Sequence, residues 1–204
     1  FLEYLMDYWI AQGITNFVIA VGYLSDQIIG YFGEEYRGCK VQYSIEEVQL
    51  GTGGSLLAAK KYLNNDEPFL LLNGDTFFEI DLMALQAFHQ ESGSEWTFCM
   101  FRPPELGRYM GMQVGSDGRL IDAGSILGGE GALANGGVYL INPRVLAAED
   151  WTTREKFSLE ADLVPQSLKR GLRFFGFESN GEFIDIGMPG DFARAPSVIR
   201  SRLL

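Results

Sequence analysis

The chain has 204 residues, of which 47% are hydrophobic and 21% are charged, and its formal net charge is −11 at pH 7. This composition predicts one soluble globular domain with a substantial core, and the negative charge argues against a nucleic-acid-binding surface, which needs a basic stripe. No apolar run approaches the about 18 residues of a membrane span, no signal-peptide pattern is present and Cys39 and Cys99 have no motif spacing, so we expect a protein of the reducing cytoplasm.

Predicted helices and strands alternate in the first half of the chain. The helices have an amphipathic period or follow a capping serine and cover 1–10, 25–31, 55–63 and 82–90. The strands are apolar or alternating runs bounded by glycine or proline and cover 17–21, 40–45, 69–73 and 96–101. This alternation is typical of right-handed βαβ units in a mostly parallel sheet.

The second half of the chain predicts an antiparallel side element and further strands. A hairpin is predicted around the turn 116–119. The later elements are strands over 135–141, 173–177 and 183–186, a helix over 158–169 with Ser158 as its N-cap, and a last helix that Pro189 opens. No repeat or linker divides the chain, so we expect residues 1–204 to form one α/β domain.

The apolar run 69–73 ends with Gly74 and Asp75. Four apolar residues in a row predict a strand that is buried on both faces in the middle of a parallel sheet, and ligands bind beyond the carboxyl ends of such strands. A carboxylate is costly to bury there unless it is paired, hydrogen-bonded or bound to a metal. Asp75 is therefore a candidate Mg²⁺ ligand or catalytic acid, and the alternative is a turn residue that caps the next segment.

A second aspartate, Asp185, repeats this arrangement. It lies at the end of an apolar strand and precedes Gly187 and a helix that starts with Pro189. Two such aspartates can bind one Mg²⁺, which takes one or two protein carboxylates and completes its coordination with water and phosphate oxygens. Taken singly, each is equally well explained as a capping or turn residue.

The stretch 50–55, Leu-Gly-Thr-Gly-Gly-Ser, predicts a glycine-rich loop between a strand and a helix. Glycines expose backbone N–H groups and leave room for a ligand against the main chain. A dinucleotide-binding fingerprint fits poorly, because its third glycine position holds Leu56 and the motif does not open the fold. A ligand-binding loop and a purely structural tight loop remain as interpretations.

His89 is the only histidine of the chain. It lies on the polar face of the helix predicted over 82–90, so we expect its side chain to be solvated. One histidine without a second also argues against a zinc site.

Five stretches, taken together and in order, carry a family resemblance. They are Ser44 to Gly54, Leu72 to Asp75, Asn135 to Tyr139, Ser158 to Glu160 and Ile184 to Pro189. The set resembles the sugar-1-phosphate nucleotidyltransferases, and most closely the bacterial guanylyltransferases that act on mannose 1-phosphate or D-glycero-D-manno-heptose 1-phosphate. The resemblance spans nearly the whole chain and is far more specific than any one motif.

The resemblance implies an enzyme that joins a nucleoside triphosphate, with GTP favoured, to a sugar 1-phosphate and releases pyrophosphate. Asp75 and Asp185 would hold Mg²⁺, and Glu46 is a candidate to bind the guanine edge. The implied nucleotide-binding residues are Glu46, Leu50, Gly51, Thr52, Gly53, Gly54, Asn73 and Gly74. The implied sugar-phosphate-binding residues are Tyr109, Gly111, Asn135, Gly136 and Glu160. The implied fold is a Rossmann-like three-layer sandwich with a mostly parallel mixed sheet and a small antiparallel side element, and domains of this kind can form homodimers.

The chain also departs from the family pattern in three places. The family's opening glycine-rich phosphate loop, with its arginine and lysine, is expected before Phe1. The usual Glu-Lys pair after the hairpin is replaced by Asp122-Ala123, and the usual Tyr-Gly pair is interrupted as Tyr109-Met110-Gly111. Missing cations remove electrostatics that phosphoryl transfer needs. The alternative hypothesis is therefore a non-catalytic module of the same fold that binds nucleotides or sugar nucleotides.

Overall fold

The structure is a computed structural model that describes residues 1–64, 66–103, 109–126, 133–147 and 156–200. The helices are α1 (Leu2–Ala11), α2 (Ser25–Phe32), α3 (Gly51–Ala59), α4 (Leu82–Glu91), α5 (Val164–Lys169) and α6 (Pro189–Arg200). Short 3₁₀ helices cover Lys60–Tyr62 and Pro143–Ala147, and a π-helical turn, Leu159–Leu163, leads into α5. None of these helices is both long enough and apolar enough to cross a membrane.

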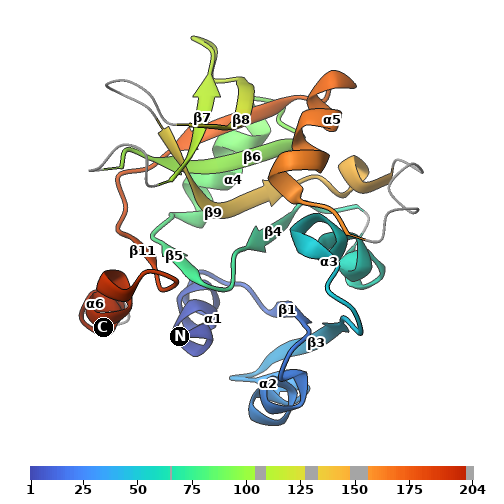
Figure 1. Ribbon diagram of the computed structural model, residues 1–204, viewed down its shortest axis with the longest axis vertical. Coiled ribbons are helices and arrows are strands. Elements are labelled where there is room, and N and C mark those ends of the chain that lie inside the picture. Colours follow the sequence, from blue (N-terminus) through green and yellow to red (C-terminus); the bar gives the residue numbers. More distant parts are fainter. Residues whose placement is uncertain (65, 104–108, 127–132, 148–155, 201–204) are drawn as a thin grey trace.

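The strands form three sheets (Figure 1). They are β1 (Asn16–Val21), β2 (Glu35–Tyr36), β3 (Cys39–Ile45), β4 (Phe69–Leu72), β5 (Thr76–Phe78), β6 (Trp96–Phe101), β7 (Met110–Val114), β8 (Leu120–Ile126), β9 (Leu133–Ile141), β10 (Phe174–Glu178) and β11 (Phe183–Asp185). The first sheet has the order β1-β3-β2, the second β10-β6-β9-β7-β8 with β4 beside β9, and the third pairs β5 with β11. β1 with β3 and β6 with β10 are parallel pairs within an otherwise antiparallel arrangement. The predicted mixed α/β class is confirmed.

Two hydrophobic clusters give the fold its three layers. Residues of β6 alternate between them, since successive side chains of a strand point to opposite faces. One cluster lies under α3 and α5 and includes Leu56, Trp96, Phe98, Tyr139, Val164 and Phe174. The other lies under α1, α4 and α6 and includes Trp9, Leu85, Cys99, Phe101, Leu140 and Ile199. The large sheet is therefore the middle layer, with helices on both faces.

β4 differs from its prediction. The apolar run predicts a place in the middle of a parallel sheet, whereas β4 pairs antiparallel with β9, with Phe69 opposite Ile141 and Leu72 opposite Val138. All four residues of β4 are half-buried rather than buried. An apolar run indicates that both faces of a strand are covered. It does not indicate whether the neighbouring strand runs parallel or antiparallel.

The glycine-rich stretch 50–55 also differs from its prediction, because it begins the helix α3 instead of forming a loop. α3 starts at Gly51, before the predicted start at Ser55. A Cβ atom on Gly51 would lie 2.6 Å from the Phe157 carbonyl oxygen, and one on Gly53 would lie 2.5 Å from the Phe157 ring. The Gly53 N–H donates to that same carbonyl at 3.1 Å. The glycines therefore let α3 pack directly on the chain at Phe157.

His89 is buried, with 6% of its surface exposed, so the prediction of a solvated side chain is wrong. Its Nδ1 atom lies 2.8 Å from the Thr97 hydroxyl on β6. Burial lowers the pKa of His89 below its ordinary value of 6.5. The prediction failed because polar residues neighbour His89 in α4, although His89 itself faces the sheet.

We expect this histidine to make the fold less stable in mild acid. The unfolded chain takes up the His89 proton near pH 6.5, while the folded chain resists it, so stability is lost as the pH falls from 6.5 towards the lowered pKa. The check is the melting temperature between pH 8 and pH 5 for the wild type and for His89→Gln, in which an amide can still meet Thr97. The wild type should lose more stability than the variant, and equal losses would contradict this role.

Candidate active site

β5 and β11 bring the two candidate metal ligands together. Asp185 lies opposite Thr76, the residue that follows Asp75. The Ile186 N–H donates to the Asp75 carbonyl oxygen at 2.9 Å. Two aspartates far apart in the sequence are thus neighbours across one antiparallel strand pair. The chain forms this pair because Phe77, Phe78 and Ile184 are buried in the same hydrophobic cluster.

The surroundings of this acidic pair fit a magnesium ion. Asp75 is exposed and Asp185 is half-buried, and the Oδ1 atom of Asp185 accepts a hydrogen bond from the Gly187 N–H at 2.9 Å. Within the described residues neither carboxylate is in an ion pair, and no group of three or more His, Cys, Asp or Glu could hold a metal. Two carboxylates open to solvent match Mg²⁺, which keeps waters and shares its coordination with phosphates, and do not match a closed zinc site.

Gly137 joins β9 to the residues on either side of Asp75. Its φ angle is +69°, a conformation that favours glycine. Its carbonyl oxygen accepts from the Asn73 N–H at 2.8 Å. A Cβ atom here would lie 2.6 Å from the Thr76 hydroxyl and 2.7 Å from Asn73 Nδ2. Gly137 therefore sets the positions of Asn73 and Thr76, whereas Gly74 is exposed and has open space around its Cα.

A buried tyrosine connects two of the predicted sugar-side residues. The Asn135 amide donates to the Tyr139 hydroxyl at 2.7 Å, and that hydroxyl donates to Glu160 Oε1 at 3.4 Å. Burial, with a smaller effect of the Glu160 charge, raises the pKa of Tyr139. The hydroxyl therefore keeps its proton and can hold both partners. The sequence motifs predict no role for Tyr139, although Tyr139 shares one face of β9 with Asn135 by the two-residue period of a strand.

The same carboxylate reaches the start of α3. Glu160 Oε2 accepts from the Ser158 hydroxyl at 3.1 Å and from the Thr52 hydroxyl at 3.4 Å. Thr52 in turn accepts from the Leu159 N–H at 2.8 Å, and the Ser158 hydroxyl caps the π-helical turn by accepting from Ala161 N–H. Residues predicted to bind the nucleotide and residues predicted to bind the sugar thus share one hydrogen-bond network.

We expect Tyr139→Phe to lower the stability of the fold by about 1–3 kcal/mol, because it removes the two hydrogen bonds that the buried Tyr139 hydroxyl makes with Asn135 and Glu160. It should also raise the KM for the sugar 1-phosphate, since Asn135 and Glu160 lose their common partner. Urea unfolding and steady-state kinetics measure the two effects. Tyr62→Phe is the matched control, because the Tyr62 hydroxyl makes no hydrogen bond within the described residues. Equal behaviour of the two variants would contradict the network.

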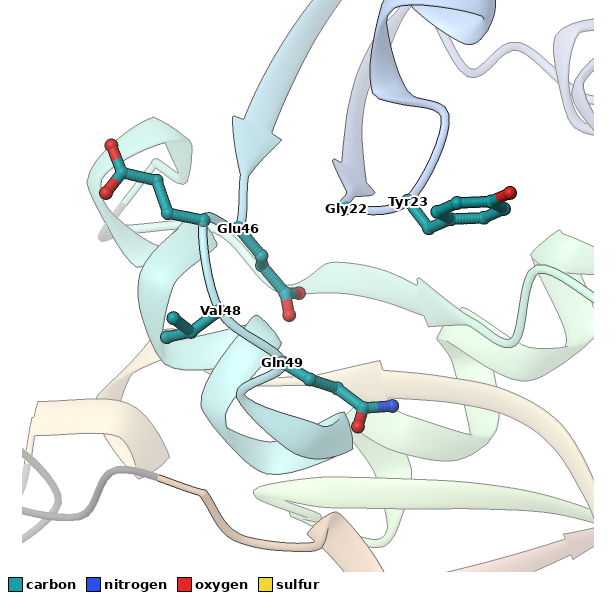
Figure 2. Close-up of a pocket in the computed structure, with 6 residues that line it drawn as sticks. Gly22, Tyr23, Glu46, Val48 and Gln49 are labelled. Carbon is teal, nitrogen blue, oxygen red and sulfur yellow. The ribbon is translucent and has the colours of Figure 1, made fainter.

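Glu46 follows β3 directly and lines a pocket of about 430 Å³. Its Oε2 atom accepts from the Leu50 N–H at 3.1 Å, which fixes the connection between β3 and α3. The other lining residues are Gly22, Tyr23, Glu47, Val48 and Gln49. Figure 2 shows Tyr23 on one side of the opening and the side chains of Glu46 and Gln49 on the other. Lys156 donates to Gln49 Oε1 at 2.8 Å.

The remaining predicted sugar-side residues have different surroundings. Gly136 is buried in β9, and the Phe78 ring occupies the place that a side chain would need. Gly111 lies in β7 opposite Ala134 of β9. Tyr109 packs edge-on against Phe183 at 5.5 Å, two residues before Asp185, and lines a second pocket of about 340 Å³. Gly111 and Gly136 are thus part of the strands β7 and β9, and Tyr109 lies beside β11, which contains Asp185.

The family model described as Nucleotidyl transferase matches residues 1–202. The chain belongs to this family. One relative, a D-glycero-alpha-D-manno-heptose 1-phosphate guanylyltransferase of Aneurinibacillus thermoaerophilus, is 36% identical and the match covers 96% of this chain and 83% of the relative. A relative with the same name in Campylobacter jejuni subsp. jejuni is 34% identical over 94% of this chain and 82% of the relative.

Solved structures of the same family have the same fold. HddC from Yersinia pseudotuberculosis superposes with a TM-score of 0.83 at 28% identity, covering 98% of this chain and 84% of that chain. The same protein complexed with GMP-PN superposes with a TM-score of 0.82 at 26% identity, covering 96% of this chain and 84% of that chain. The predicted resemblance and the nucleotide-diphospho-sugar transferase fold are confirmed.

Proposed function

We propose that the protein is a guanylyltransferase that joins GTP to D-glycero-D-manno-heptose 1-phosphate or mannose 1-phosphate. The observation that carries this proposal is the strand pair β5–β11, which makes Asp75 and Asp185 neighbours. The named activity of the relatives and the GMP-PN complex of HddC support the choice of guanine and of the sugar.

Free, buried Cys39 and Cys99 support a cytoplasmic location. The homodimer implied by the resemblance stays a prediction.

Asp75 and Asp185 would hold the Mg²⁺, which when bound supplies positive charge against the phosphate oxygens. The sugar 1-phosphate oxygen attacks the α-phosphorus of GTP, a new P–O bond forms, and the bond to the leaving pyrophosphate breaks. Little covalent work falls to the protein in such a step, so its residues contribute by positioning and electrostatics.

The other predicted residues position the two substrates. Thr52 and Glu46, on either side of the start of α3, would bind the nucleotide, with the free lone pairs of Glu46 facing the N–H edge of guanine. Asn135 and Glu160 would bind sugar hydroxyls, and their hydrogen bonds to Tyr139 hold them in place before substrate arrives. Fixed polar groups lower the barrier because they need no reorganisation during the reaction.

The test is pyrophosphate release from GTP with each of the two sugar 1-phosphates. We expect release with GTP and one or both sugars.

A second candidate, a non-catalytic binding module, is favoured by Asp122-Ala123 in β8, where family members carry Glu-Lys. Tight GDP-sugar binding without any pyrophosphate release would favour that module. Thermal shifts with GTP, ATP, UTP and CTP test the base, since a ligand that binds only the folded state raises the melting temperature.

A further inference from the structure

The aromatic ring of Tyr23 is exposed to solvent beside the Glu46 pocket. Tyr23 follows Gly22, just after the end of β1, and is 91% exposed. Aromatic side chains carry large apolar areas that usually contribute to packing. The ring of Tyr23 therefore offers a flat apolar face beside a pocket that already contains polar side chains.

The backbone next to Tyr23 is strained. Leu24 has a φ angle of +58°, in the left-handed region that costs a residue with a Cβ about 1–2 kcal/mol. Leu24 is also half-exposed, so its own burial offers little compensation. Strained residues of this kind cluster at ligand-binding positions. Leu24 directly precedes α2, so its conformation sets the course of the chain from β1 past the pocket residue Tyr23 into α2.

The charges around the pocket indicate which part of a nucleotide fits. None of its six lining residues is basic, and Glu46 and Glu47 are acidic. Carboxylates repel phosphates, whereas they accept hydrogen bonds from the N1–H and N2–H₂ donors of guanine. The volume of about 430 Å³ is ample for a purine. The polar wall formed by Glu46 and Gln49 can meet the edge of a base whose face lies on an aromatic ring.

We infer that the Tyr23 ring stacks on the guanine base of the bound nucleotide and is a further nucleotide-binding residue of this protein. This inference rests on the proposed function, because it takes GTP as the occupant of the site. Tyr23 supplies the contact with the base face and Glu46 the contact with the base edge. The hydroxyl of Tyr23 is not needed for stacking, so Phe should replace it and Ala should not.

The experiment compares Tyr23→Ala, Tyr23→Phe and the wild type in equilibrium binding of GTP and of tripolyphosphate, which has no base. Loss of one base–aromatic stack should weaken GTP binding about tenfold. Tripolyphosphate binding should stay the same in all three proteins, and Tyr23→Phe should bind GTP like the wild type. Steady-state kinetics should show a higher KM for GTP in Tyr23→Ala, with kcat and the KM for the sugar 1-phosphate nearly unchanged.

Tyr31→Ala is the matched control. Tyr31 is 64% exposed near the far end of α2, away from the pocket residues, so its loss should leave GTP binding unchanged. Unchanged GTP binding in Tyr23→Ala, an equal loss of tripolyphosphate binding, or no GTP binding by the wild type would each overturn the inference. Wild-type turnover together with an unaffected Tyr23→Ala would leave the proposed function standing. GTP binding that depends on Tyr23, without any turnover, would support the inference and contradict the proposed function.

Discussion

Asp185→Asn is expected to lower kcat by about 10²–10³-fold while the fold stays intact. The amide oxygen can still accept the Gly187 hydrogen bond that Asp185 Oδ1 accepts at 2.9 Å, so the turn after β11 is kept. The substitution removes one negative charge from the position proposed to hold Mg²⁺, and losing one electrostatic contact to a reacting phosphate costs about this much. Pyrophosphate release at saturating GTP and sugar 1-phosphate measures the effect.

Two further variants make this prediction specific to the pair. Asp75→Asn should lose about as much activity as Asp185→Asn, and the double variant should be little worse than either, because residues that act as a unit are not additive. Asp26→Asn is the control, an exposed aspartate on α2, and should retain full activity. Independent, multiplying losses in the double variant would show that the two carboxylates do not serve one ion.

Gly137→Ala is expected to cost about 2–5 kcal/mol of stability and most of the activity. The new methyl group would lie 2.6 Å from the Thr76 hydroxyl and 2.7 Å from Asn73 Nδ2. Overpacking of this kind costs about 1–3 kcal/mol, and an alanine at φ +69° adds about 1–2 kcal/mol of backbone strain. Since Asn73 and Thr76 flank Asp75, any relief of the clash displaces the proposed metal ligand.

Gly171→Ala separates the two causes of destabilisation, which are overpacking and backbone strain at a positive φ angle. Gly171 has a φ angle of +79° but nothing within 4 Å of an added Cβ, so this variant should lose only about 1–2 kcal/mol and keep its activity. Urea unfolding of both variants gives the stabilities, and kcat gives the effect on the site. Equal destabilisation would mean that backbone strain alone matters at Gly137, and an active Gly137→Ala would disconnect this glycine from the site.

Sequence patterns predicted most of the elements because local signals are strong in this chain. The apolar run of β4, the capping serine at Ser158 and the proline that opens α6 each correspond to an observed element. Asp75 follows β4 and Asp185 ends β11, and pairing of β5 with β11 makes these two residues neighbours. That their carboxylates share one metal ion stays a prediction.

The features that were missed depend on partners distant in the sequence. The burial of His89 depends on Thr97 of β6, the helical state of Gly51 to Gly54 depends on Phe157, and the antiparallel pairing of β4 depends on β9. Tyr139 acquires its role only because Glu160, from another segment, reaches its hydroxyl. Local periodicity contains no information about such contacts.

The most direct test of a metal site shared by Asp75 and Asp185 is to locate the metal ion. Crystals grown with Mn²⁺ and a non-hydrolysable GTP analogue would reveal the ion by its anomalous scattering. We expect one peak within coordination distance of both the Asp75 and the Asp185 carboxylates and of the nucleotide phosphates, and no such peak in Asp185→Asn. A peak that contacts neither aspartate, with nucleotide bound, would contradict the proposal that these two strands carry one metal site.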